Sequence, residues 1–238
     1  MLTEPNGDLS RRERERLMRR RAMLRAAQAV FAEKGYARAT LDEIAERAEF
    51  GKGTLYNYFE GGKEDILFAV LDEVHDDIHA LIEASFTGEE ATGRPLRAQF
   101  RTMVLKAFEL FLEREDLFMV LIKESHRLCF SENDAHVAYF QRQQDRMVDA
   151  LAPVLEDAMA GGTLRHFPER SLAHMMLENI NGMVVHRAMM DRNDENEEGA
   201  SILHAPEKAA DFLTTILFDG LTASSETLDA ATTEPTNA

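Results

Sequence analysis

Hydrophobic and polar residues alternate with the period of an α-helix along most of this chain. Between residues 23 and 31 the apolar positions recur three and four residues apart, which predicts a helix over about 13–34. Gly35 stands where a helix C-cap belongs. Thr40 then begins a second helix, because Glu43 three residues later completes a capping box. No segment reads convincingly as a strand, so the pattern predicts an all-α fold of about nine helices.

Seven further segments carry the same helical periodicity. The shortest covers residues 52–58, and the longer ones are expected at about 63–84, 97–112, 116–128, 131–160, 169–190 and 207–221. Pro153 is expected to bend the longest helix, and Pro206 suits the first turn of the last one. Residues 88–95 and 191–199 are expected to be loops.

Size and composition place this chain among globular proteins. Its 238 residues, of which 45% are hydrophobic, are enough to bury a substantial core. No apolar run approaches the roughly 20 residues that a membrane span needs, and the arginine-rich N-terminal region has no apolar segment of a secretory signal. We therefore expect a cytoplasmic protein without membrane contact. The single cysteine, Cys129, excludes an internal disulfide and a cysteine-based zinc site, and its apolar neighbours predict a buried thiol.

Charge is unevenly distributed along the chain, whose net charge is −16. Residues 1–63 hold 13 Lys and Arg against 10 Asp and Glu, whereas the remainder holds 14 against 33. This contrast indicates a small end suited to nucleic acid on an acidic body. The acidity of the body needs no special explanation, because it keeps a protein soluble. The arginines before the first helix fit a frayed helix end and equally an arm that contacts DNA phosphates or the minor groove.

Residues 40–63 predict two short helices joined by a tight turn, the helix-turn-helix arrangement. In that arrangement the second helix lies in the major groove of DNA and the first crosses the backbone. The polar side chains of the second helix are those of Lys52, Thr54, Tyr56, Asn57 and Tyr58. One cation, a hydroxyl, an amide and two phenols suit phosphate oxygens and base edges. Leu55 and Phe59, four residues apart, can anchor the opposite side on the core.

Four short blocks in this part of the chain share a recognisable order and spacing. They are FAEKGY at residues 31–36, TLDEIA at 40–45, KGTLYNYF at 52–59 and GKEDIL at 62–67. With these blocks, the segment from about residue 20 to residue 71 resembles the TetR family of bacterial transcriptional regulators. The resemblance implies a three-helix DNA-binding domain and a fourth helix that links it to a C-terminal effector and dimerisation domain. It also implies a homodimer that binds double-stranded DNA.

The resemblance assigns contacts with DNA to eight residues. Those that match phosphate contacts are Thr40, Lys52, Tyr56, Tyr58 and Lys63, and those around base contacts are Gly53, Thr54 and Asn57. Three features depart from the family pattern. Glu49 stands where a turn glycine is usual and is expected to be strained, and Gly51 is a weaker N-cap than serine. Residues 60–62 exceed the usual spacing before Lys63 by one, which is expected to shift the phosphate site at the start of the fourth helix.

The C-terminal part offers residues for a ligand pocket. The candidates are Phe108, Phe111, Met119, Phe140, Met147, Met176, Glu178, Asn179 and Met183. An apolar stripe at helical spacing is more often plain core, but the resemblance implies that some of these residues line a pocket between helices. Methionine surfaces adapt to varied apolar ligands, so the expected effector is a lipophilic small molecule. Glu178 and Asn179 can anchor its polar end or take part in a dimer contact, and an acid inside the pocket would favour a cationic lipophile.

The sequence patterns and what the resemblance implies together divide the chain into four regions. They are a disordered arm at 1–12, a helix-turn-helix DNA-binding domain at 13–62, a ligand-binding and dimerisation domain at 63–222 and a disordered tail at 223–238. The resemblance implies that the last two long helices pair with their twins in a four-helix dimer interface. The expected function is a dimeric repressor that a small-molecule ligand releases from a palindromic operator.

Two other classes of function fit less of the sequence. One is an all-α dimeric binding or scaffold protein whose helix-turn-helix no longer contacts DNA, which Glu49 and the net acidity favour. The other is a helical enzyme, but the chain has no glycine-rich phosphate loop, nucleophile elbow or HExxH motif. His75 with His79, and His174 with Glu178, have the spacing of metal ligands without further convergent ligands. We therefore expect neither catalysis nor a metal or cofactor.

Overall fold

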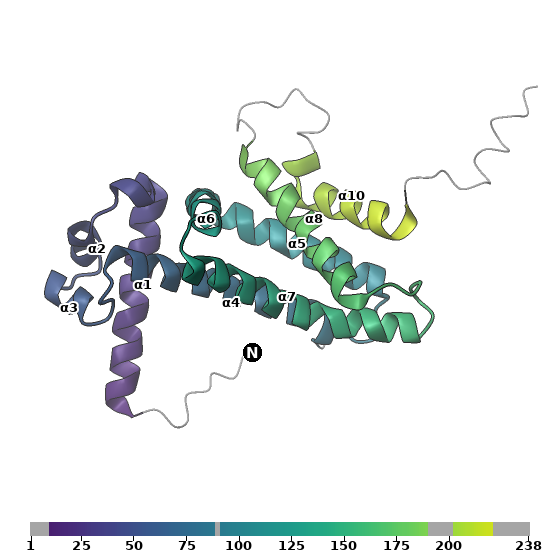
Figure 1. Ribbon diagram of the computed structural model, residues 1–238, viewed down its shortest axis with the longest axis horizontal. Helices are drawn as coiled ribbons and strands as arrows, with labels where there is room; N and C mark the ends of the chain where they lie inside the picture. The colour runs from purple at the N-terminus through teal and green to yellow at the C-terminus, as the bar shows by residue number, and fades with distance from the viewer. Residues whose placement is uncertain (1–9, 89–90, 190–201, 221–238) are drawn as a thin grey trace, which may run out of the picture.

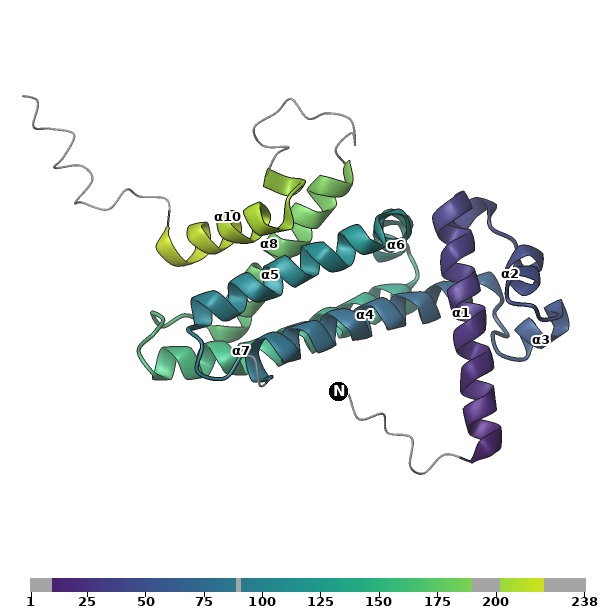
Figure 2. The same ribbon diagram turned by 180° about the vertical axis from the view of Figure 1, so that it is seen from behind.

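The computed structural model describes residues 10–88, 91–189 and 202–220. Within this part of the chain all regular secondary structure is α-helical, as the sequence pattern predicts (Figure 1). The helices are α1 (Arg11–Arg38), α2 (Leu41–Arg47), α3 (Lys52–Tyr56), α4 (Lys63–Thr87), α5 (Leu96–Glu113), α6 (Glu115–Cys129), α7 (Asp134–Ala160), α8 (Glu169–Met189) and α10 (Pro206–Asp219). The first three helices form a head at one end, and α4 connects it to a body made of the others (Figures 1 and 2).

Helix α1 begins earlier than the sequence predicts, because Ser10 supplies an N-cap. The Ser10 hydroxyl accepts from the Glu13 N–H at 3.3 Å, and the Glu13 carboxylate accepts from the Ser10 N–H at 2.8 Å. This complete capping box makes Arg11 and Arg12 helical, although they were expected in a disordered arm. Gly35 interrupts the helix with a φ of +75°, which residues with a side chain rarely adopt, so the expected break at this position is confirmed.

A tight turn joins α2 to α3. Thr40 and Glu43 form the expected capping box at the start of α2. Beyond the other end of α2, Glu49 has a φ of +60°, a left-handed conformation that costs a residue with a β-carbon about 1–2 kcal/mol. The Phe50 N–H donates to the Ala45 carbonyl at 2.9 Å and so holds the turn in place. The conformation that normally calls for glycine is therefore present, as the sequence predicts.

A first core lies where α1, α2, α3 and the start of α4 meet, and it continues under α6 of the body. Its large buried side chains are Met23, Leu24, Phe31, Ile44, Leu55, Phe59, Ile66 and Leu67. Leu55 and Phe59 are the two residues expected to anchor the α3 segment. Burying such a side chain contributes about 1.5–3 kcal/mol, so packing rather than intrinsic helix stability holds the short α3.

The body is a bundle in which each later helix covers an earlier one. α4 packs against both α5 and α7, α8 packs on α7, and α10 packs on α5 (Figure 2). A second core fills the space between them, with Phe100, Phe108, Leu151 and Leu155 completely buried. α6 packs against α1, and this contact joins the body to the head.

Helix boundaries in the body agree with the sequence pattern within a few residues. α7 starts three residues later than expected because the Asn133 side chain accepts from the Ala135 N–H at 3.0 Å. Pro206 occupies the first turn of α10, as predicted, and Pro153 lies within α7, where the expected bend stays a prediction. The expected loop at 191–199 and most of the two expected disordered ends lie outside the described residues. No helix in the described residues is long and apolar enough to cross a membrane.

Candidate functional site

Helix α3 lies at the outer end of the head (Figure 1). The exposed residues are Lys52, Gly53, Tyr56 and Asn57, with 43% of Tyr56 accessible. Thr54 and Tyr58 are partly buried at the edges of this surface. We call these six residues the α3 face. The helix ends at Tyr56, two residues earlier than expected, so Asn57 and Tyr58 extend from the turn that follows it.

Gly53 exposes the backbone of the α3 face, although packing within the protein does not require a glycine at this position. A β-carbon built on Gly53 meets no heavy atom within 4 Å, apart from its immediate surroundings in the helix. Glycine inside a helix costs roughly 0.5–1 kcal/mol relative to alanine. A bare backbone on an exposed helix is useful where another molecule approaches closely, as DNA does in a major groove.

Two of the predicted phosphate ligands already have partners within the head. The Thr40 hydroxyl accepts from the Glu43 N–H at 3.3 Å as part of the capping box. The Lys52 ammonium donates to the Asp42 carboxylate at 2.9 Å, and both side chains are exposed. Since an exposed ion pair contributes only about 0–1 kcal/mol, a DNA phosphate can replace Asp42 beside Lys52 at little cost.

The ammonium group of Lys63 is turned into the head. It donates to the backbone carbonyls of Tyr36 at 2.9 Å, Ala37 at 3.3 Å and Ala39 at 2.9 Å, and it lies 4.6 Å from the centre of the Tyr36 ring. These carbonyls follow the break at Gly35 and lead into α2. Lys63 therefore satisfies carbonyls that the end of α1 leaves without helical partners.

The start of α4 also differs from the expected phosphate site. Its first turn carries Glu64 and Asp65, and the Asp65 carboxylate accepts from the Gly61 N–H at 2.6 Å. A carboxylate therefore already occupies a backbone donor of this turn. A phosphate contact by Lys63 stays a prediction, and the contacts in the head give this lysine a structural role as well.

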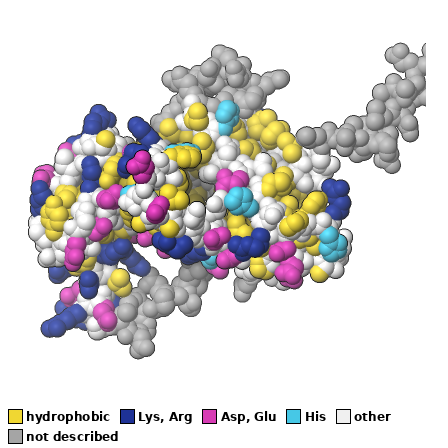
Figure 3. Space-filling model, in the orientation of Figure 1, with side chains coloured by type: hydrophobic (Ala, Val, Ile, Leu, Met, Phe, Trp, Pro, Cys, Tyr) yellow, Lys and Arg dark blue, Asp and Glu magenta, His cyan; other side chains and the backbone are white. Residues whose placement is uncertain are grey.

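The N-terminal half of α1 extends past the rest of the head as an arginine-rich helix (Figures 1 and 3). Its exposed arginines are Arg11, Arg12, Arg14, Arg16, Arg19 and Arg21. The Arg16 guanidinium lies 5.8 Å from the centre of the Tyr58 ring, and Arg20 lies 5.5 Å from that of Phe59. This part of α1 therefore runs beside the segment that carries the α3 face, as an ordered helix.

A largely apolar cavity of about 650 Å³ lies in the body between α4, α5, α6, α7 and α8. Small-molecule sites in proteins usually measure about 300–1,000 Å³. The larger apolar side chains along its walls include those of Val74, Ile78, Phe111, Leu121, Phe140 and Met147. Its size and walls suit an apolar small molecule.

The cavity has a partly different lining from the one predicted. Four of the nine candidates line it, namely Phe111, Phe140, Met147 and Glu178. The other five lie elsewhere, namely Phe108, Met119, Met176, Asn179 and Met183. Phe108 and Met176 are buried in the second core, whereas Met119 and Asn179 are exposed. Helical periodicity identifies the inward face of a helix but not where neighbouring helices leave space.

Four polar residues form a hydrogen-bonded group between α4 and α7, which we call the α4–α7 cluster. The Asp72 carboxylate accepts from the Tyr139 hydroxyl at 2.9 Å and from the Gln143 amide at 3.2 Å. The His75 Nδ1 lies 3.3 Å from the same hydroxyl. His75 and Gln143 line the cavity. In the sequence, Asp72 and His75 are three residues apart and Tyr139 and Gln143 are four apart, so each pair can share one side of a helix. Only the packing of α4 against α7 brings the two pairs together as a cluster.

The surroundings of the α4–α7 cluster fix its protonation. Burial lowers the pKa of His75 below its ordinary value. Burial, helped by the hydrogen bond to Asp72, raises the pKa of Tyr139 well above its ordinary value. At neutral pH the imidazole is therefore neutral and the phenol keeps its proton.

A second group of polar residues lines the cavity where α7 meets α8. The Glu178 carboxylate accepts from the Gln144 amide at 2.8 Å and from the Asn181 amide at 3.4 Å. His174 Nε2 lies 3.5 Å from the same Gln144 amide. All four residues are exposed as well as lining the cavity, so the cavity opens between α7 and α8.

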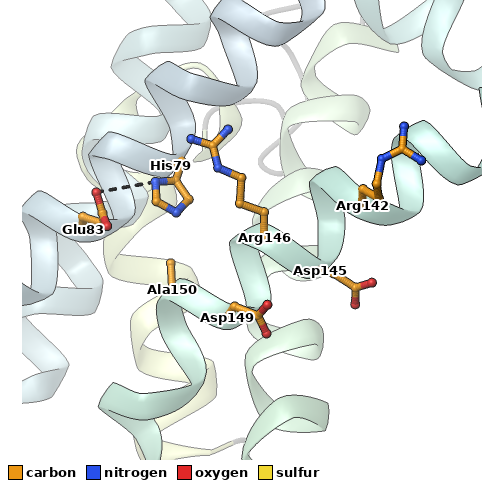
Figure 4. Close-up of a pocket in the computed structure, with 7 residues that line it drawn as sticks. All are labelled: His79, Glu83, Arg142, Asp145, Arg146, Asp149 and Ala150. Atoms are coloured by element: carbon orange, nitrogen blue, oxygen red, sulfur yellow. Dashed lines mark ion pairs between the residues drawn. The ribbon is translucent and has the colours of Figure 1, made fainter.

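A second, smaller hollow of about 390 Å³ lies between α4 and α7 and is lined mainly by charged residues (Figure 4). His79 lies 3.5 Å from the Glu83 carboxylate, and Arg146 donates to Asp76 at 2.6 Å. These charges satisfy one another, so the hollow is a weaker ligand candidate than the apolar cavity. No group of three or more His, Cys, Asp and Glu side chains among the described residues is arranged to hold a metal ion.

An exposed helix-turn-helix beside a helical body with an apolar cavity matches known regulators. Residues 23–70 match the family model of bacterial regulatory proteins, tetR family. The chain belongs to the TetR family. It is a transcriptional regulator of the helix-turn-helix type, and the TetR family is one of DNA-binding regulators rather than enzymes.

Relatives of this TetR-family regulator cover different parts of it. The uncharacterized regulator YhgD from Bacillus subtilis is 24% identical over 67% of this chain and 79% of its own length. TtgR from Pseudomonas putida is 35% identical over 43% of this chain and 48% of its own length.

Solved structures share the fold over most of the chain. FadR from Bacillus subtilis, solved in complex with stearoyl-CoA, has a TM-score of 0.66 at 20% identity and covers 85% of this chain and 100% of its own. GusR from Salmonella enterica has the same TM-score and identity and covers 93% of this chain and 99% of its own. At these identities the likeness is one of fold.

Proposed function

We propose that this regulator is a homodimeric repressor that a lipophilic small molecule releases from a palindromic operator. The observation that carries the proposal is the pairing of a bare, polar α3 face with an apolar cavity in the same chain. The α3 face offers hydroxyl, amide and lysine groups for phosphates and base edges. The cavity offers a site where a ligand can act on the spacing of two such faces.

Two helices, α4 and α6, connect the cavity to the head, which supports this proposal. Phe118 and Leu121 of α6 line the cavity and also belong to the core that includes α1 of the head. α4 likewise lines the cavity with Val74 and Ile78 and begins within the head. A ligand that fits the cavity better in one arrangement of α4 and α6 shifts the population toward it. Operator binding weakens if that arrangement places the two α3 faces at the wrong spacing.

The proposed effector is apolar over most of its length. The solved FadR complex holds stearoyl-CoA, which shows that a protein of this fold can take a long acyl chain. In this chain the apolar walls of the cavity support an effector with a hydrocarbon part, as an acyl chain has.

A gel-shift titration with DNA from upstream of this protein's own gene tests the proposal. The expected result is a salt-dependent, sequence-preferring shift. Tyr56→Phe should weaken binding to all sequences, because a phenol that donates to a phosphate carries no sequence information. Asn57→Ala should instead change the preferred bases, if Asn57 reads a base edge.

One outcome contradicts the proposal itself, and another contradicts only the role of Asn57. No sequence-preferring shift at any protein concentration would favour the scaffold alternative. Equal loss of affinity on every sequence for Asn57→Ala would assign Asn57 to the phosphate backbone. Addition of lipophilic compounds to the preformed complex then tests release separately from binding.

A further inference from the structure

The polar groups on the inner wall of the cavity present hydrogen-bond acceptors. The Tyr139 hydroxyl has a single proton, which it donates to the Asp72 carboxylate at 2.9 Å. His75 Nδ1, 3.3 Å from that hydroxyl, therefore carries the imidazole proton and donates it to the phenol oxygen. The neutral ring then has an unprotonated Nε2, which can only accept.

Gln143 adds a second acceptor. Its Nε2 donates to the Asp72 carboxylate at 3.2 Å, and this contact fixes the amide orientation, because the reverse would place two acceptors together. Its Oε1 is buried and accepts no hydrogen bond from any described residue. A buried oxygen left without a donor costs about 1–3 kcal/mol, and a donor brought by a ligand would recover that cost.

Away from the α4–α7 cluster the polar lining is mixed, and the amides of Gln144 and Asn181 already donate to Glu178. His126 Nδ1 lies 2.8 Å from the Ile122 carbonyl and therefore carries a proton. Glu178 brings a carboxylate to the opening. Among the described residues that line the cavity there is no Lys or Arg. Beside the α4–α7 cluster, a carboxylate or phosphate on a ligand would therefore meet acceptors and no matching positive charge.

We propose that the cavity takes an apolar molecule whose polar end donates hydrogen bonds and has no negative charge, with an alkyl or aryl amine as the preferred class and an alcohol or phenol next. The donor group meets His75 Nε2 and Gln143 Oε1, and the apolar part lies against Phe111, Phe118 and Leu121. The inference rests on the proposed function, because it takes this cavity as the effector site.

Calorimetric titration of the full chain with four decyl compounds tests the class of head group. The probes are decylamine, decanol, decanoate and decyltrimethylammonium, each used below the concentration at which it aggregates. Decylamine should bind most tightly and decanol next, with decanoate at least about tenfold weaker than decylamine. Decyltrimethylammonium has the positive charge without an N–H donor, so it should also bind at least about tenfold more weakly than decylamine.

Matched variants place the head group. His75→Leu and Gln143→Leu should each lower the affinity for decylamine about tenfold and leave decyltrimethylammonium almost unchanged. His79→Leu is the control, because His79 lies one turn further along α4 and faces the charged hollow of Figure 4 rather than the cavity. Circular dichroism of each variant shows whether it keeps the helical fold, and the decyltrimethylammonium titration reports whether the cavity is intact.

Each outcome counts for or against the inference. The order decylamine, decanol, decanoate with loss on His75→Leu supports it. Tightest binding of decanoate, equal binding of all four probes, or binding of none overturns it. A gel-shift experiment with the same probes tests the proposed function separately from the ligand class. If decylamine binds the protein but does not release the operator, the ligand class is supported and the proposed release mechanism is contradicted.

Discussion

Single residues in the head show how one side chain can serve structure and leave function to its neighbours. Lys63 matches a family position that contacts a DNA phosphate. Its ammonium nevertheless lies among three backbone carbonyls beside Tyr36. Those carbonyls lack helical partners because Gly35 breaks α1 with a positive φ. The lysine thereby connects the start of α4 to the joint between α1 and α2.

Replacing Lys63 by methionine should lower the free energy of unfolding by about 2 kcal/mol, because hydrogen bonds to a charged group contribute about 1.5–3 kcal/mol and the carbonyls lose their donor. Urea unfolding followed by circular dichroism measures the change. Lys123→Met, an exposed lysine on α6, is the control and should change stability by less than about 0.5 kcal/mol. An unchanged unfolding midpoint for Lys63→Met together with a smaller salt dependence of DNA binding would instead assign the lysine to phosphate.

At the scale of an element, α1 is longer than the region shared with the family model. The match begins at residue 23, whereas the helix begins at Arg11 under the Ser10 capping box. Arg12, Arg16 and Arg19 are spaced by four and three residues and share one side of α1, and Arg16 lies over Tyr58 beside the α3 face. Arg21 and Arg25 lie on the opposite side. This asymmetry predicts that one side of the extension faces DNA phosphates.

The double substitution Arg12→Gln and Arg16→Gln should weaken binding to all DNA sequences. If both arginines neutralise phosphates, the slope of the logarithm of the binding constant against the logarithm of salt concentration should fall by about 1.8, at about 0.9 for each phosphate that is no longer neutralised. Gel shifts at several salt concentrations measure this slope. Arg21→Gln with Arg25→Gln removes the same charge from the opposite side and should change the slope much less; equal changes for the two pairs would point to a diffuse charge effect.

At the scale of the whole molecule, the proposed repressor needs two copies of the α3 face in fixed register. α8 and α10 are the helices expected to pair with their twins, and each exposes large apolar side chains, Met175 on α8 and Phe212 on α10. Phe212 is 45% exposed on a helix whose other side packs on α5. Burial of such residues between two copies would supply the free energy of a dimer.

Phe212→Asp should convert the protein from the mass of two chains to that of one in analytical ultracentrifugation, since a charge would be buried without a partner. The variant should also lose operator affinity at least about a hundredfold, because two half-sites would no longer be bound together. Phe167→Asp introduces the same charge at another exposed phenylalanine and serves as the control. A variant that stays dimeric would exclude the Phe212 side of α10 from the interface.

The sequence by itself determined the order of the helices and the identity of the head. The capping box of Thr40 and Glu43 and the break at Gly35 follow from local backbone chemistry, which neighbouring residues encode. The left-handed turn at Glu49 follows instead from the family resemblance, which places a glycine at that position. The same holds for the exposed α3 face, because Leu55 and Phe59 select which side of the segment is buried.

Only the tertiary structure decided where Lys63 points and which residues form the cavity. Phe108 and Phe111 have the same helical character in sequence, yet one is buried in packed core and the other lines empty space. The α4–α7 cluster joins residues more than 60 positions apart, and its hydrogen bonds fix the tautomer of His75. Periodicity records which side of a helix turns inward, whereas space and hydrogen-bond partners depend on how separate helices meet.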